Sequence, residues 1–227
     1  IHDAFAPNQI PESLLMDIVA RETQIETLFN TFRASFEGEE ASDNQLREVL
    51  KSESNIARRR AAWEASKLVG QAIAPALLEL VKIRNKAAQS LGYSDYYSMM
   101  FELQELNIDR VFRLFDNLER LSESAFTAMK SELDARMKAR FGVSEGASFP
   151  WLYSDPFFQE YPAAGGGELL DAIFANADIE ALTRAHFESI GLDITDLIQR
   201  ADLYERDGKS QHAFCLDVDR EGDVRVL

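Results

Sequence analysis

The sequence predicts a mainly α-helical chain in which the first antiparallel strands of a small sheet begin at the C-terminal end. Apolar residues recur at three- and four-residue steps over most of residues 1–200, and caps and glycines divide this pattern into separate helices. After residue 200 the pattern changes to the alternation of strands. Helices followed by strands favour an α+β parent fold, which divides the chain into a helical region, 1–200, and the start of a sheet, 201–227.

The first predicted helix runs from Pro11 to about Phe36, with proline in its first turn, and Gly38 ends it. Ser42 is a candidate cap for a short helix that follows. A further helix is expected from about Ser54 to Gly70. Its successor runs to Leu91-Gly92, with Pro75 in the first turn.

The longest periodic run extends from Arg110 to about Phe141, and it predicts a scaffold helix that spans most of a domain. Asn107 is its expected cap and Gly142 its expected end. Asp95 is expected to cap the shorter helix before it.

An aromatic-rich loop, Val143 to Gly167, interrupts the helices, and it is either a functional loop or an aromatic plug between helices. Two further helices are expected, from Glu168 to about Asn176 and from Asp178 to about Ile190. A short turn from Ile194 to Gln199 then leads into the strands.

The last segment, Ala201 to Leu227, alternates apolar and polar residues around an Asp219-Arg220-Glu221-Gly222 turn. The chain then stops at Val224–Leu227, which has the pattern of a strand that has only begun. An unpaired apolar strand is an unusual end for a domain. We therefore expect this chain to be the front portion of a larger protein, with the chemistry in the portion that follows.

The composition excludes some partners and leaves others open. With 39 acidic and 24 basic residues the net charge is −15, which argues against nucleic acid and anionic membrane as partners. The single cysteine, Cys215, excludes an internal disulfide, and a cytoplasmic location is the default expectation. The chain does not begin with methionine, so a leader removed before Ile1 keeps export open.

The sequence holds none of the common catalytic signatures. HExxH, GxSxG, GxxxxGK[ST] and GxGxxG are all absent, and three histidines with one cysteine are too few for a self-contained zinc site. His212 and Cys215 stand three positions apart, so in a strand they would point to opposite faces, which argues against a thiol nucleophile. A buried, unreactive cysteine is the expectation.

The pair His212-Ala213 at the start of a predicted strand has two interpretations. The backbone here could bind an extended peptide as an added strand, with His212 aimed at a substrate carbonyl to stabilise developing negative charge. The alternative is an ordinary strand with Phe214 and Leu216 facing the core.

Several of these stretches resemble gluzincin zinc metallopeptidases of the angiotensin-converting-enzyme-like, oligoendopeptidase F and thimet oligopeptidase group. The resembling runs are Gly208 to Cys215 with the turn and Val224–Leu227 after it, the Asp155-Pro156-Phe157-Phe158-Gln159-Glu160 loop after Trp151, and Ala61-Ala62-Trp63 leading into Leu91-Gly92-Tyr93.

The resemblance implies an incomplete zincin-like fold in which long helices wall a channel that admits short or unfolded peptides. It implies zinc in the full-length parent, held by an HExxH helix beyond residue 227, with the motif glutamate as general base and no metal bound by this chain. His212 would donate to a substrate carbonyl, and Ala213 would be a backbone partner of the peptide. The implied partners are a peptide substrate and the missing C-terminal catalytic portion.

The sequence thus predicts the N-terminal part of an oligopeptidase or peptidyl-dipeptidase that hydrolyses short peptides, inactive without its remainder. The alternative is a non-catalytic helical module of the same fold that binds peptides or a protein.

Overall fold

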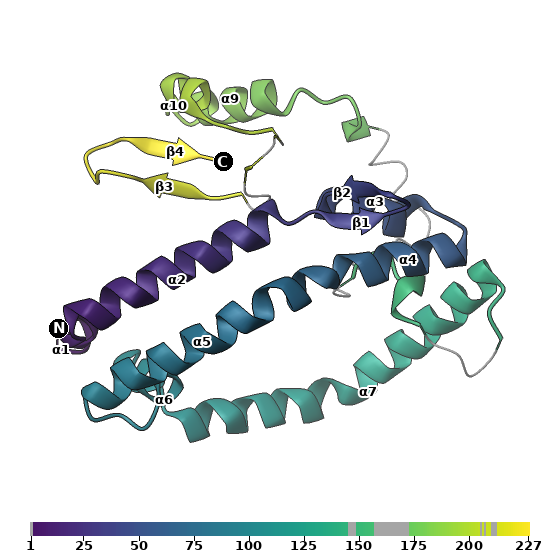
Figure 1. Cartoon of the computed structure of the whole chain (residues 1–227). Coiled ribbons are helices and arrows are strands. Elements are labelled where there is room, and N and C mark those ends of the chain that lie inside the picture. Colours follow the sequence, from purple (N-terminus) through teal and green to yellow (C-terminus); the bar gives the residue numbers. More distant parts are fainter. Residues whose placement is uncertain (1, 145–148, 157–172, 205, 207, 210–212) are drawn as a thin grey trace. The chain divides into compact units, whose positions relative to one another are not determined.

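The computed structural model describes residues 2–144, 149–156, 173–204, 206, 208–209 and 213–227 (Figure 1). They belong to two compact units, Ile1–Glu160 and Tyr161–Leu227. The first unit is mainly helical with one small hairpin, and the second carries a hairpin at its C-terminal end, so the mainly α fold class is confirmed. The functional division at residue 200 stays a prediction. No helix among the described residues is both long and apolar enough to cross a membrane.

The first unit begins with α1 (His2–Phe5), the 3₁₀ helix η1 (Ala6–Gln9) and the long helix α2 (Glu12–Thr31). Helix α2 packs along α5 (Leu68–Ser90), and α5 packs on α6 (Tyr96–Leu103). Their shared core is built from apolar residues at helical spacing, with small alanines that allow close approach: Ile10, Ile18, Leu80, Ala87, Ala88 and Met99.

The prediction that the first helix reaches Phe36 is wrong. Helix α2 ends at Thr31, and β1 (Ala34–Phe36) pairs antiparallel with β2 (Glu39–Ala41), Ala34 opposite Ala41. The turn between them places Glu37 at φ 56° and Gly38 at φ 89°, a left-handed region that glycine adopts freely and glutamate rarely. A glutamate there gives a weak turn signal, so the sequence does not indicate that the residues before Gly38 form a strand.

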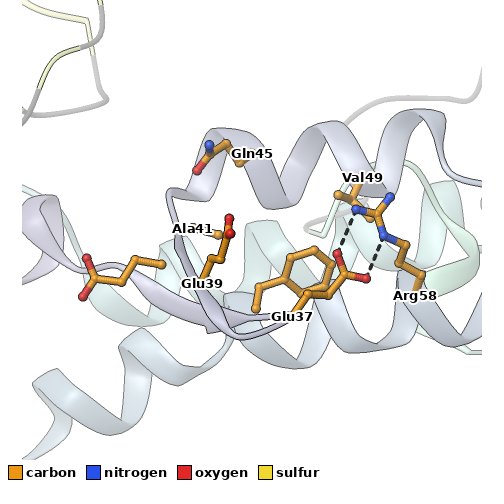
Figure 2. A pocket seen from close by; sticks show the side chains of 8 residues that line it. Glu37, Glu39, Ala41, Gln45, Val49 and Arg58 are labelled. Atoms are coloured by element: carbon orange, nitrogen blue, oxygen red, sulfur yellow. Dashed lines mark hydrogen bonds and ion pairs between the residues drawn. The ribbon is translucent and has the colours of Figure 1, made fainter.

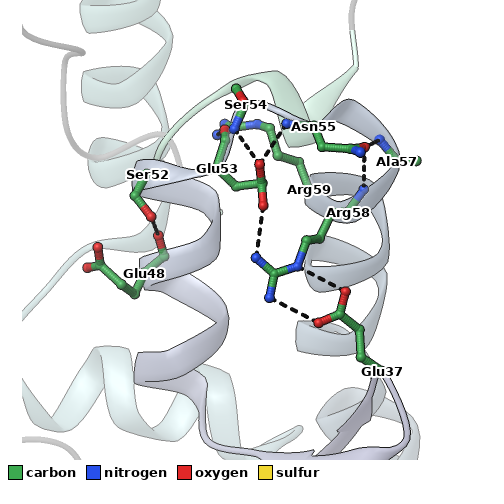
Figure 3. Close-up of polar contacts among 9 residues, drawn as sticks. All are labelled: Glu37, Glu48, Ser52, Glu53, Ser54, Asn55, Ala57, Arg58 and Arg59. Carbon is green, nitrogen blue, oxygen red and sulfur yellow. Dashed lines mark hydrogen bonds and ion pairs between the residues drawn. The ribbon is translucent and has the colours of Figure 1, made fainter.

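Arg58 holds this hairpin to the connection between α3 (Asp43–Ser52) and α4 (Ile56–Ser66) (Figure 3). Its Nε and one terminal nitrogen donate to the two carboxylate oxygens of Glu37, at 2.9 and 3.0 Å, and its other terminal nitrogen donates to Glu53 at 2.8 Å. The hydrogen bond from Arg58, with backbone donors from Asn55 and Ser54, lowers the pKa of Glu53 to about 2. This bidentate contact stabilises the turn at the uncommon Glu37 conformation.

The break between the next two helices lies at Lys67, not at the predicted Gly70. Helix α5 begins at Leu68 and continues through Gly70, so Pro75 lies inside α5 rather than in its first turn. Proline has no N–H for the carbonyl four residues before it. The tertiary packing of α5 on α2 and α6 outweighs that local cost.

The expected scaffold helix is α7 (Ile108–Phe141), and its ends agree with the prediction. The Asn107 side chain accepts from the Arg110 N–H at 2.9 Å, and Gly142 ends the helix at φ 63°. The predicted caps Ser42, Asp95 and Asp178 are also confirmed.

The described part of the aromatic loop forms a plug against the C-terminal half of α7. It contains the 3₁₀ helix η2 (Pro150–Leu152), and Leu152 and Tyr153 are buried in a cluster with Leu133 and Met137. Phe157 and Phe158 lie outside the described residues. For Trp151 to Tyr153, the plug interpretation is therefore confirmed.

Arg59 ties this plug to α4. The side chain is 1% exposed, and its three nitrogens donate to the carbonyls of Trp151 at 2.8 Å, Tyr153 at 2.9 Å and Glu53 at 2.9 Å. The guanidinium also lies 4.6 Å from the centroid of the Phe141 ring. Burial, with Arg140 nearby, lowers the pKa of Arg59 to about 10, so it stays charged at neutral pH.

A second polar group fixes the plug from the other side. Tyr153 donates its hydroxyl hydrogen to Asp134 at 2.5 Å, and Lys130 contacts both groups, at 2.5 Å to Asp134 and 2.6 Å to the Tyr153 oxygen. Burial raises the pKa of Asp134, but the hydrogen bonds from Lys130 and Tyr153 outweigh it and hold the pKa below its ordinary value. The loop is thus attached to α4 by Arg59 and to α7 by this trio.

The second unit contains α9 (Ile179–Ser189), α10 (Thr195–Arg200), β3 (Cys215–Asp217) and β4 (Val224–Val226). Most of the helix expected from Glu168 to Asn176 lies outside the described residues. Helix α10 packs on β4, which places the hairpin against the helical part of its own unit.

Candidate functional site

The C-terminal hairpin is the candidate site, and its turn is the one the sequence predicts. The Asp219 carboxylate accepts from the N–H groups of Glu221 at 2.9 Å and Asp223 at 3.0 Å, while Arg220 and Gly222 take positive φ of 60° and 108°. An aspartate that bonds to the backbone after it, followed by glycine, is a strong turn former.

The two strands pair with a defined register, Cys215 opposite Val226 and Asp217 opposite Val224. Phe214 and Leu227 exchange both backbone hydrogen bonds, at 3.0 and 2.9 Å. On its other side β4 accepts a bond at the Val226 carbonyl from the Asp202 N–H, at 2.9 Å. The final strand, expected to lack a partner, is therefore paired with β3 on one side and accepts one backbone hydrogen bond from Asp202 on the other.

This register decides what the outer edge of β3 offers. In an antiparallel ladder alternate residues bond to the partner strand, and the residues between them direct N–H and C=O the other way. Since Phe214 bonds to Leu227, the backbone groups of Ala213, Cys215 and Asp217 are directed to the outer edge. Among the described residues no further strand pairs there. We refer to residues 213–217 on this side as the outer edge of β3.

The side chains of the hairpin correct two expectations. Phe214 and Leu216, expected to face a core as an ordinary strand, are 46% and 54% exposed, and Val218 on the same face is 59% exposed. Cys215, expected to be buried, is also exposed. The predicted strand alternation is present, but alternation identifies a face of a strand and not what covers that face.

Lys209 is a buried polar contact of the second unit. Its buried ammonium donates to the carbonyls of Asp202 and Tyr204, and it lies 3.4 Å from the Asp202 carboxylate. Asp202 in turn bonds to β4 through its own N–H. No sequence signal distinguishes this lysine from a surface lysine.

Of the two predicted site residues, Ala213 is described and His212 is not. Ala213 is exposed and directly precedes Phe214. His212 lies outside the described residues, together with Ser210 and Gln211, so its contact with a substrate carbonyl stays a prediction.

The described residues offer no donor set that fits a zinc ion. No group of three or more histidine, cysteine, aspartate or glutamate side chains is placed to hold a metal in that part of the chain. The residues that the structure describes therefore do not fit a zinc ion.

Among the described residues, two open pockets have no residue of the C-terminal hairpin in their lining. One, about 420 Å³, lies between β1–β2 and α3 and is lined by Glu37, Glu39, Glu40 and Arg58, among others (Figure 2). Its charges are partly satisfied internally, because Glu37 is paired with Arg58. The other, about 560 Å³, is lined by the start of α9 and by Tyr204. The Tyr204 hydroxyl donates to Glu180 at 2.7 Å.

Comparison with solved structures confirms the resemblance at the level of the fold. The chain is similar to a crystal structure from Bacillus anthracis str. Ames described as an oligoendopeptidase F, with a TM-score of 0.58, 19% identity and coverage of 99% of this chain and 42% of that one. It is similar to Pz peptidase A with an inhibitor, with a TM-score of 0.60 and 17% identity, and to a second oligoendopeptidase F structure, with 0.59 and 17%, each over 99% of this chain and 41% of theirs.

No family model matches the sequence, and no curated protein matches it. The chain spans about two fifths of the structures that it resembles. The TM-scores and the coverage show that the chain has the fold of a part of these structures. Because the identities are below one fifth, the similarity shows the fold alone.

Proposed function

We propose that this chain is the N-terminal part of a zinc-dependent metallopeptidase that hydrolyses short peptides, with the zinc site in a portion beyond residue 227. The observation that carries the proposal is the fold similarity over 99% of the chain to structures described as oligoendopeptidase F and Pz peptidase A. In this proposal the long helices of the first unit wall the substrate channel, and the protein acts in the cytoplasm.

The outer edge of β3 is the proposed peptide-binding element. An extended peptide laid along it would bond to the N–H and C=O groups of Ala213, Cys215 and Asp217, at every second residue of the strand. Such backbone bonds hold a peptide in register without reading its side chains. His212, directly before Ala213, would donate to a carbonyl of the bound peptide and stabilise the negative charge that develops on its oxygen.

The same edge also supports the second candidate function. A strand edge binds an extended peptide whether or not the peptide is cleaved, so a non-catalytic peptide- or protein-binding module would use the same backbone groups.

Peptide hydrolysis by the protein at its natural length tests the proposal. We expect cleavage of short quenched-fluorescent peptides, loss of cleavage with a zinc chelator, and recovery when zinc is added back; the 227-residue chain alone should not cleave. Cleavage that the chelator does not reduce would overturn the proposal of a zinc peptidase. Peptide binding without cleavage in the presence of zinc would also overturn it, and would establish the peptide-binding module instead.

His212→Ala tests the proposed site within that protein. Removing one donor of this kind costs about ten- to a thousandfold in kcat/KM. His186→Ala, an exposed histidine of α9, is the matched control and should leave kcat/KM unchanged. Equal kinetics for the two variants would refute the role of His212.

A further inference from the structure

Helix α7 carries one apolar stripe along its whole length, but only part of the stripe is covered. In the C-terminal half, Leu133 and Met137 are buried under the plug of Trp151 to Tyr153. Steps of three and four residues continue the same stripe towards the N-terminus through Met129, Phe126, Ser122, Leu118, Phe115 and Val111. The stripe is therefore one helix face and not two unrelated patches.

The N-terminal half of this face is largely exposed. Five of its large apolar residues are each 50% to 68% exposed: Phe112, Leu114, Phe115, Leu118 and Leu121. Among the described residues, α6 packs on α7 near its start, and η2 packs against its second half. Figure 1 shows α6 beside the start of α7. We refer to residues 112–122 on this side of the helix as the bare face of α7.

Its size argues against an ordinary solvated surface. Large apolar side chains bury about 150–250 Å² each, so half-exposure of five gives on the order of 500 Å², at the upper end for the largest apolar patch of a monomer. An apolar face about half the helix circumference wide is typical of a helix with a core on that side. The bare face is continuous with a face that already has such a core.

We propose that the bare face of α7 is a docking surface for a further apolar segment of the same polypeptide, beyond residue 227. The similar structures indicate the occupant: 99% of this chain matches them, but more than half of each has no counterpart here. A partner within the same polypeptide covers such a face permanently, as the plug covers the second half. The inference rests on the premise of the proposed function that the polypeptide continues, but not on catalysis.

Thiol labelling at two matched serines tests the proposal. Ser122 lies on the bare face, whereas Ser124, two residues on, is about 200° away around the helix at 100° per residue, and both are exposed in this chain. Ser122→Cys and Ser124→Cys are made separately, in the 227-residue chain and in the protein at its natural length. N-ethylmaleimide uptake at each position is followed by peptide mass spectrometry, which separates these sites from Cys215.

We expect similar labelling rates at both positions in the 227-residue chain. In the natural-length protein, labelling at residue 122 should be about tenfold slower or more than at residue 124. Similar rates at the two positions in the natural-length protein, or a natural chain that ends at Leu227, would overturn the proposal. Protection of residue 122 that grows with concentration in the 227-residue chain would also overturn it, since a second copy would then be the occupant.

Thermal unfolding of Phe115→Ser is a second test, and it does not depend on correct folding of the cysteine variants. It should lower the Tm of the natural-length protein by several degrees and leave the 227-residue chain nearly unchanged. An equal shift in both would overturn the proposal. Peptide hydrolysis is measured separately, so a protein that cleaves peptides but labels equally at both serines fails this inference alone.

Discussion

The two halves of α7 have the same apolar periodicity but different surroundings. The C-terminal half is covered by a loop fixed at both sides by polar contacts, whereas the N-terminal half exposes residues as large as those buried further along. A helical stripe states which side of a helix is apolar, and it does not state what covers that side. The covered half should therefore carry most of what α7 contributes to the stability of this chain, and the bare half should contribute almost none.

The largest expected effect is at Leu133, which is fully buried in the covered half. Leu133→Ala removes buried methyl groups and leaves a cavity, so it should lower the free energy of unfolding by about 2–5 kcal/mol. Urea unfolding followed by tryptophan fluorescence measures this loss, because Trp151 packs against the cluster that contains Leu133. The ring centroids of Trp151 and Trp63 are 5.8 Å apart. A loss no larger than that of Phe115→Ala would show that the two halves of α7 do not differ in their contribution to stability.

Arg59 should come next. Arg59→Met keeps an unbranched apolar stem but leaves the carbonyls of Glu53, Trp151 and Tyr153 without their donor, which should cost about 2–3 kcal/mol. Arg60→Met is the comparison variant, because Arg60 is exposed and makes weaker contacts. It pairs with Glu64, worth about 0.3–0.5 kcal/mol, and lies 5.1 Å from the centroid of the Trp151 ring, worth about 0.5–1 kcal/mol. Equal losses for both arginines would mean that the plug does not depend on Arg59.

Tyr153→Phe should have a smaller effect that depends on pH. It removes the hydroxyl that donates to Asp134 and accepts from Lys130, and it should cost about 1–2 kcal/mol at neutral pH. Asp134 has a pKa below its ordinary value, so its contribution is present above the unfolded pKa of about 3.9 and is lost as the pH falls through the folded pKa. The difference between wild type and Tyr153→Phe should therefore narrow in acid. A difference that stays constant with pH would exclude Asp134 as the partner that matters.

The smallest effect is expected on the bare face. Phe115→Ala should change the free energy of unfolding of the 227-residue chain by less than about 0.5 kcal/mol, as for an ordinary surface position. The same urea titration measures it beside Leu133→Ala. A loss of several kcal/mol would show that the first half of α7 is already packed in solution.

The sequence could predict those parts of the fold that local chemistry decides. Asn107 and Gly142 carry cap signals strong enough to place both ends of a 34-residue helix. It could not predict Glu37 in a left-handed turn, because the bond from Arg58, 21 residues on, stabilises that conformation. Pro75 inside α5 is a similar case, in which tertiary packing overrides a local signal.

The candidate site shows the same division. Asp219 and Gly222 predict the turn, and the turn sets the register that directs Ala213 to the outer edge. The exposure of Phe214 and Cys215 depends on what lies over the hairpin, which alternation alone does not state. The buried Lys209 gives no local signal either, since its acceptors are main-chain carbonyls that any residue could supply.

The contacts of Arg59 have a consequence for the folding of the chain during its synthesis on the ribosome. One of its acceptors, the Tyr153 carbonyl, is 94 residues further along the sequence. At about 5–20 residues per second, synthesis needs roughly 5–20 seconds to reach that acceptor after Arg59 is added. Throughout that interval α4 holds a guanidinium that the nascent chain cannot yet bury, so the plug must be a late, post-emergence step in folding.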